Sequence, residues 1–436
     1  MRSTLRSARL RRILAAYAVN RIGTFIGLLA LLVAVFDHTH SALAVAGLLL
    51  AGQAVPAFAV PSLVARVEAS SRGHELSGLY VFEAVVTAGL AGLLMWHFQL
   101  AALLVLAALD GTAALAASAL LRAELARAAR DQLAAQPATQ ALDEAARATA
   151  AQQAERSANA ALNVTFSATF VAGPVLGGVI VAAAGAPAAL LIDVASFLAC
   201  GVLLLDLHPH VDEAGGDSVL GRLRTAWLHI SQTRALRTLL LVDAIALVCF
   251  ESAAPVEVTF AKATLHAGDR GLGLLLTAWG AGAVIGSLVF ARLRGRSLAL
   301  MLSAGALAIG FAYIGLAAAP TLAVACLMAL LGGIGNGVEL PALMSVVQEL
   351  TPHSLHGRII GAVESLGALC VAIGLPLGGA LVALSSPRIA FVVIGAGTTA
   401  VAVALFAVSR GWAHPGQEQE HGGAPVAETA ITPPPA

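Results

Sequence analysis

The sequence predicts an all-α membrane protein with twelve transmembrane helices in two pseudo-symmetric six-helix halves. The chain is 58% hydrophobic and 11% charged, with a mean hydropathy of +0.86, whereas soluble domains carry roughly 25% charged residues. Apolar runs of about 20 residues, the length that crosses a bilayer, recur from Ile13 to Val408. Features of the first half return in the second half, which indicates a duplicated unit.

Each predicted helix corresponds to one apolar run of membrane-spanning length. The predicted spans cover residues 13–36, 42–65, 76–97, 100–121, 157–185, 187–207, 236–261, 271–292, 297–318, 321–345, 357–384 and 388–408.

The distribution of positive charge orients these helices. Of the 25 lysines and arginines, 21 fall in segments that share one side of the membrane, and three, Lys262, Arg270 and Arg388, fall on the other. We therefore expect a multi-pass protein of the cell (inner, cytoplasmic) membrane. The positive-inside rule places both of its termini in the cytoplasm. The first apolar run is too long for a signal peptide and contains Arg21, so we expect an uncleaved first span.

The domain boundaries follow from internal repetition. The first half, 13–207, follows a cytoplasmic N-terminus of residues 1–12, and the second half, 236–408, precedes a disordered cytoplasmic tail, 409–436. Repeated segments early in the two halves are about 25 residues farther apart than the two glycine motifs are. This difference predicts a cytoplasmic insertion over 122–156 in the first half. We interpret this insertion as helices, either a solvated elaboration or a partner-binding element. Residues 208–235 form a central linker whose amphipathic part, including Trp227 and Ile230, is expected at the membrane surface.

A glycine-rich motif interrupts the fifth span. Gly173, Pro174, Gly177 and Gly178 lie in one apolar run, and a weaker repeat, Gly374-Leu375-Pro376-Leu377-Gly378-Gly379, lies in the eleventh. Proline bends a helix, and glycines allow close approach of a neighbouring helix. A duplicated, weakened helix of this kind indicates a protein that moves, not a simple anchor.

The motif resembles the antiporter motif of the major facilitator superfamily. Its surroundings are similar to the drug- and siderophore-exporter-like branch, which includes enterobactin and macrolide exporters. The similar segments are 159–163, 271–275, 291–296 and 348–358. Two positions depart from the family pattern, since Thr169 replaces a glycine and Ala65 replaces the acid that precedes Arg66 in the cytoplasmic loop.

Ionisable residues within the spans are the candidate site, because each is costly in hydrocarbon. The resemblance implies that helices 1, 4, 7 and 10 line a central cavity. These helices carry five such residues: Arg21, Asp110, Asp243, Glu251 and Glu339. Arg21 and Asp110 lie at similar depth, about 13 and 15 Å from the membrane surfaces, so we predict that they pair. The pair is either a protonatable switch or a static salt bridge.

Three further acids lie on helices expected outside the cavity. They are Glu83, Asp193 and Glu364. For these residues structural hydrogen bonding is favoured, although Glu83 is deep enough to be a second proton site.

No catalytic set, cofactor or metal site is expected. The four cysteines and the His38/His40 and His208/His210 pairs lack the partners of a metal site. Zero net charge excludes a strongly basic nucleic-acid binder. An intramembrane enzyme or a signalling module is the alternative class, but no nucleophile–base set supports an enzyme.

The resemblance therefore implies a monomeric secondary transporter that uses proton influx to export a small, partly hydrophobic compound. A metabolite importer or uniporter of the same fold is the alternative. The sequence leaves the substrate open.

Overall fold

The computed structural model describes residues 7–57, 75–136, 139, 143–205, 219–293, 295–352 and 355–409. Within these ranges the regular secondary structure is helical. The helices are α1 (Ala8–Thr39), α2 (Ala42–Leu49), η2 (Leu50–Ala54), α4 (Glu75–Trp96), α5 (Leu100–Ala134), α7 (Glu144–Leu203), α8 (Val219–Gln232), α9 (Arg234–Thr259), η3 (Phe260–Thr264), α10 (Gly268–Arg292), α11 (Leu298–Ala318), α12 (Leu322–Glu349), α13 (His356–Leu384) and α14 (Pro387–Ser409). The segments η2 and η3 are short π-helices.

The described helices account for the predicted spans, the second of them only in part. Ten described helices are long and apolar enough to cross a membrane, and a shorter apolar helix covers Ala42–Ala57. The long helix α7 holds two predicted spans, because it contains a break at Gly185, whose φ of 83° favours glycine. The rest of the predicted second span, together with Arg66 and Ala65, lies outside the described residues.

Short polar side chains begin several helices, as capping rules lead one to expect. Ser7 accepts a hydrogen bond from the amide of Leu10 at the start of α1. Asp143 does the same for Ala146 at the start of α7, at 2.7 Å. These caps set where the helices begin on the predicted cytoplasmic side.

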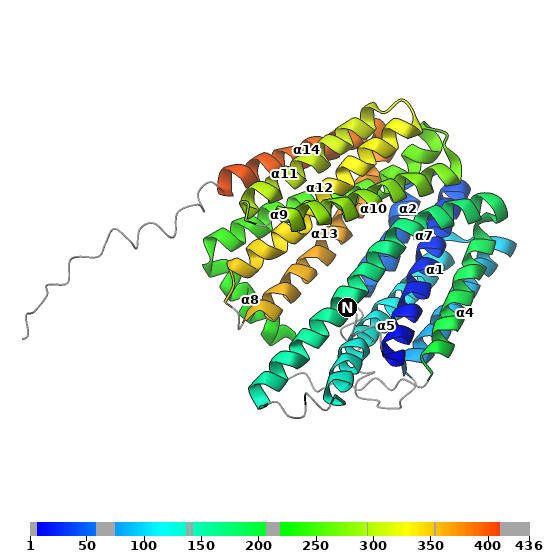
Figure 1. The fold of residues 1–436 in the computed structure, drawn as a ribbon. Coiled ribbons are helices and arrows are strands. Elements are labelled where there is room, and N and C mark those ends of the chain that lie inside the picture. The colour runs from blue at the N-terminus through cyan, green and yellow to red at the C-terminus, as the bar shows by residue number, and fades with distance from the viewer. Residues whose placement is uncertain are drawn as a thin grey trace, which may run out of the picture.

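The helices form two groups that lie side by side (Figure 1). One contains α1, α2, α4, α5 and α7, and the other contains α9 to α14. The turns at residues 40–41 and 265–267 lie at the end that the arginine distribution places outside the cell, and we call it the outer end. Here one apolar core joins both groups, because Val258, Ala261 and Leu272 cluster with Val33 and Leu29.

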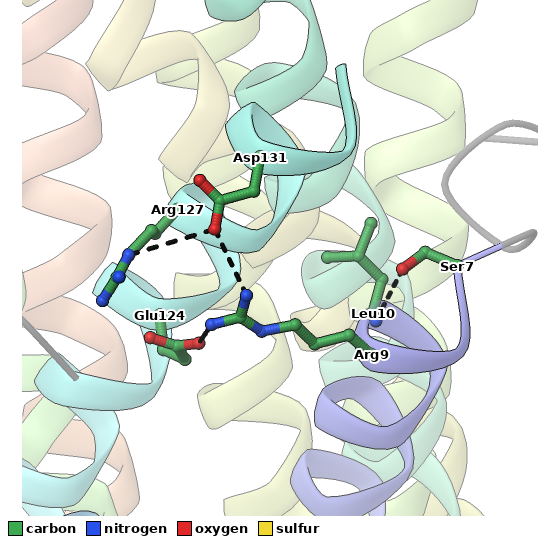
Figure 2. A network of polar contacts seen from close by, with 6 residues as sticks. All are labelled: Ser7, Arg9, Leu10, Glu124, Arg127 and Asp131. Carbon is green, nitrogen blue, oxygen red and sulfur yellow. Dashed lines mark hydrogen bonds and ion pairs between the residues drawn. The ribbon is translucent and has the colours of Figure 1, made fainter. Parts of the chain in front are cut away.

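The insertion predicted over 122–156 consists largely of extensions of two spans. Helix α5 continues to Ala134, and α7 begins at Glu144. A charge network ties these extensions to α1, where Arg9 pairs with Glu124 and lies 3.2 Å from Asp131 (Figure 2). Arg130 also pairs with Glu155 across α5 and α7, at 3.4 Å.

The amphipathic helix α8 contacts the second half. Ala226 and Ile230 are buried against its core, whereas Trp227 is 60% exposed. The sequence analysis assigned Trp227 and Ile230 to the same amphipathic stretch, but in the structure Ile230 is buried and Trp227 is exposed.

The two glycine motifs share one design. In the first motif, Gly173 and Gly177 face α1, since a Cβ added to Gly173 would lie 2.5 Å from the Phe25 Cβ. In the second, Gly374 and Gly378 face α9, the first helix of the other half; a Cβ added to Gly374 would lie 2.7 Å from the Glu251 Cβ. Each motif thus packs onto the first helix of its own half.

The last glycine of each motif faces the opposite half. A Cβ added to Gly178 would lie 3.2 Å from the Gly273 Cα on α10, and one added to Gly379 would lie 3.1 Å from the Ala42 oxygen on α2. We call these two contacts the glycine seams. Thr277 adds a hydrogen bond across the first seam, to the Val171 oxygen at 3.2 Å.

The departure at Thr169 is accommodated locally. Thr169 is buried, and its hydroxyl donates to the Phe166 oxygen of its own helix at 2.9 Å. The helix thus satisfies the hydroxyl without a partner from elsewhere.

Substituting the central glycine of the first seam should destabilise the protein. The added methyl of Gly273→Ala would lie 2.6 Å from the Pro174 oxygen, and such overpacking costs about 1–3 kcal/mol. The control Gly361→Ala adds a methyl to a helical glycine with no described atom within 4 Å. Thermal unfolding in detergent should show a lower midpoint for Gly273→Ala only. Equal midpoints would contradict the close-packed seam.

Removing the buried acid of the cytoplasmic network should cost more than removing the exposed one. The Glu124 side chain is 1% exposed and the Asp131 side chain is 53% exposed. Exposed ion pairs contribute about 0–1 kcal/mol, whereas breaking a buried pair costs about 3–5 kcal/mol. Glu124→Ala should therefore lower the unfolding midpoint well below that of Asp131→Ala. The reverse order would contradict this account.

Candidate functional site

Each half encloses a cavity that contains ionisable side chains. The N-terminal cavity has a volume of about 400 Å³ and lies among α1, α2, η2, α4, α5 and α7. Its ionisable lining residues are Arg21, Asp110 and Asp193. The sequence analysis expected Arg21 and Asp110 on a central cavity lined by helices of both halves, whereas this cavity is lined by the N-terminal half alone.

The predicted Arg21–Asp110 ion pair is wrong for this structure. In the described residues, no ion pair joins the two side chains. The Arg21 guanidinium lies over aromatic rings instead, 5.2 Å from the centre of Phe25 and 5.0 Å from that of Phe166. Such cation–π contacts contribute about 2 kcal/mol where water is scarce. Asp110 accepts a hydrogen bond from Thr87 at 3.0 Å.

Asp193 lines this cavity although the sequence analysis placed it outside. Two glycines of α1 make room for it: a Cβ added to Gly27 would lie 2.2 Å from Asp193 Oδ2, and one added to Gly23 would lie 2.0 Å from Ser196 Oγ. Ser196 donates a hydrogen bond to Asp193 at 3.1 Å. The glycine spacing of four residues on α1 was the sequence signal for a close neighbour.

Glu83 is a deeply buried acid of the N-terminal half. Its side chain is fully buried on α4, and neither carboxyl oxygen has a hydrogen-bond partner. It interacts electrostatically with Asp110 and Asp193. A buried carboxyl group without a partner is costly to maintain, and the structural hydrogen bonding favoured from sequence is not found for Glu83 among the described residues.

The C-terminal cavity brings together the remaining predicted site residues. Its volume is about 330 Å³, and it lies among α9, α11, α12, α13 and α14. Asp243 and Glu251 line it from α9, and Glu339 lines it from α12. Phe250, Asn336 and Thr398 are among the other lining residues. All ionisable groups of this lining are carboxyl groups, which gives it a different charge from the N-terminal cavity.

Glu257 was missed by the sequence analysis. It lies on α9, inside the predicted span 236–261, and interacts electrostatically with Glu251. The signal was the one used for the other acids, an ionisable residue in an apolar run.

The glycine motif shapes the two cavities differently. Gly173 faces Phe25, and the corresponding Gly374 faces Glu251. The position next to the motif is thus occupied by Phe25, under the Arg21 guanidinium, in the N-terminal half. In the C-terminal half the equivalent position is occupied by the carboxyl group of Glu251.

Comparison with sequence families identifies the second half. The Major Facilitator Superfamily matches residues 240–435. The multidrug efflux pump Tap of Mycobacterium tuberculosis (strain ATCC 25618 / H37Rv) is 29% identical over 235 residues, 51% of this chain and 54% of the pump. The Tap pump of Mycolicibacterium fortuitum is 28% identical over 238 residues, 51% of this chain and 56% of that protein. The chain thus spans about half the length of the curated relatives it matches.

Comparison with solved structures covers both halves. The nucleoside transporter NupG superposes with a TM-score of 0.71 at 10% identity, over 93% of this chain and 100% of that one. A bacterial homologue of the iron transporter ferroportin in an inward-facing state gives a TM-score of 0.66 at 16% identity, over 93% and 98% of the two chains. These likenesses show a shared fold. At the sequence level, the match to the Major Facilitator Superfamily covers residues 240–435 of this chain.

Proposed function

We propose that this protein is a secondary active transporter that exports a small, partly hydrophobic compound in exchange for protons. The observation that carries the proposal is a pair of cavities, one in each half, whose ionisable linings lie within membrane-spanning helices. Such residues are costly there unless they bind an ion or a substrate. The similarity to proteins named multidrug efflux pumps favours export.

Proton coupling is assigned to the N-terminal cavity. Asp110 and Asp193 line this cavity together with Arg21, whose guanidinium lies over aromatic rings. Glu83 is buried outside the lining and interacts electrostatically with both acids. Protons that bind these carboxyl groups would change their attraction to Arg21. That change would bias one arrangement of the halves over another.

The C-terminal cavity favours a substrate with a positive charge and an apolar body. Its three carboxyl groups attract a cation, and Phe250, Leu340 and Met344 provide apolar contacts. Methionine side chains adapt to varied apolar shapes, and aromatic rings provide a large apolar surface.

The same proposal covers orientation and assembly. Arg9, Arg127 and Arg130 lie at the end opposite Lys262 and Arg388, which supports cytoplasmic termini in the cell membrane. One chain contains both cavities, so a monomer would be sufficient. We propose no enzymatic activity.

Asp110→Asn should uncouple transport from the proton gradient. The amide keeps the shape of the side chain but cannot carry a dissociable proton. In everted membrane vesicles, an exporter should accumulate substrate when an inward-acid gradient is imposed, and the variant should lose this response. Asp131→Asn, an exposed acid outside the cavity, is the matched control. Gradient-driven uptake that survives Asp110→Asn would refute this role, and accumulation only in right-side-out vesicles would favour the importer.

Glu251→Gln should weaken binding of an organic cation. Loss of one carboxylate from the C-terminal cavity should raise the Kd for tetraphenylphosphonium roughly tenfold, which corresponds to about 1.4 kcal/mol. The measurement is the thermal shift of purified protein over a ligand titration, because a ligand at 100 times its Kd stabilises by about 2.7 kcal/mol. Glu349→Gln, an exposed acid outside the cavity, is the control. An unchanged Kd in Glu251→Gln would contradict a cationic substrate.

A further inference from the structure

Lys262, the only lysine in the chain, lies where the two halves meet at the outer end. Its Nζ is 2.6 Å from Asp37 Oδ1 on α1 and 2.7 Å from Asp269 Oδ1 on α10. Asp37 belongs to the first half, while Lys262 and Asp269 belong to the second. The lysine side chain is 12% exposed and the Asp37 side chain is 49% exposed, so water reaches this ion pair mainly from the side of Asp37.

Local backbone geometry places the lysine there. Lys262 lies in η3, where the amide of Leu265 bonds to the Phe260 oxygen, five residues back, at 2.9 Å. π-Helical turns of this kind often occur at functional sites. The following turn is tight, with positive φ at His266 and Gly268, and it leads directly into the first turn of α10, which contains Asp269.

The partner in the first half depends on the lysine. Asp37 occupies the last turns of α1, which ends at Thr39. The C-terminal end of a helix carries partial negative charge and disfavours a carboxylate. Asp269 lies at a helix start, where a carboxylate is favoured without a cation. Of the two acids, Asp37 therefore gains more from Lys262.

The Lys262–Asp37 ion pair lies beside the first glycine seam and not beside the second. Gly178 approaches Asp269 and Gly273 on α10, so the Lys262–Asp37 contact closes the same edge as the first seam. The residues that face Gly379 across the second seam are Ala42, Leu43 and Ala46. The second seam is therefore held by apolar contact.

We propose that the Lys262–Asp37 ion pair is the latch that keeps the outer end closed, and that opening toward the outside requires its rupture. When Lys262 leaves Asp37 it remains paired with Asp269, so the lysine need not become unpaired as the halves separate. The pair thus sets the equilibrium between the closed and open outer end. This equilibrium can be measured without a substrate, so its outcome is independent of the function proposed above.

The test measures the distance between the halves at the outer end. Spin labels replace Trp96 and Leu384, which end α4 and α13 and are 83% and 88% exposed. The background lacks the four native cysteines and is checked for folding by size-exclusion chromatography. Pulsed electron–electron resonance on purified protein in nanodiscs then gives the distribution of distances. Lys262→Met should raise the ratio of long to short distances by roughly threefold or more, and Lys262→Arg should leave it near the unsubstituted ratio.

Two comparisons separate a latch between the halves from a local structural role. Asp37→Asn should shift the distances as Lys262→Met does, whereas Asp269→Asn should shift them less. The exchange Asp37→Lys with Lys262→Asp keeps one ammonium group between two carboxylates and should restore the short distances. The proposal is overturned by an unchanged distribution in Lys262→Met, or by an effect of Asp269→Asn as large as that of Asp37→Asn. A well-folded exchange variant that stays open would overturn it as well.

Discussion

The close approach of helix backbones at the glycine seams is the constraint on which the arrangement of the two halves depends. Gly178 against Gly273, and Gly379 against Leu43, let helices of opposite halves meet without intervening side chains. In a bilayer, association rests on such packing, because lipid is as apolar as the helix surface. Each motif also anchors its helix to the first helix of its own half. The seams therefore join two units that are each internally packed, and this is the mechanical requirement for two bodies that rock against each other.

The two halves share a scaffold but differ in charge. In the N-terminal half a guanidinium is present and its aromatic neighbours hold it. In the C-terminal half the corresponding space contains carboxyl groups, with Glu251 at the position equivalent to Phe25. The duplicated backbone thus carries two chemically distinct cavities. This difference is the physical basis for assigning proton coupling to one half and a cationic substrate to the other.

The helices could be predicted from sequence because apolar length and arginine distribution are one-dimensional signals. Side-chain partners could not, since depth in the membrane leaves the direction around each helix axis undetermined. Arg21 and Asp110 line one cavity of the N-terminal half, and the Arg21 guanidinium lies over Phe25 and Phe166. Asp193 was misplaced for the same reason, although Gly23 and Gly27 marked the face of α1 that receives it. The loop residue Arg66 lies outside the described residues.

The break at Gly185 gives α7 a role as a mechanical link. Seven residues before it, Gly178 contacts the opposite half, and eight residues after it, Asp193 lines the N-terminal cavity. The two arms are each about 10–12 Å long at 1.5 Å per residue, and a single glycine joins them without a loop. A short connection of this kind transmits displacement instead of absorbing it. Separation of the halves at the outer end would therefore shift the carboxyl group of Asp193 deep in the membrane. In this way α7 would couple the outer end to the N-terminal cavity.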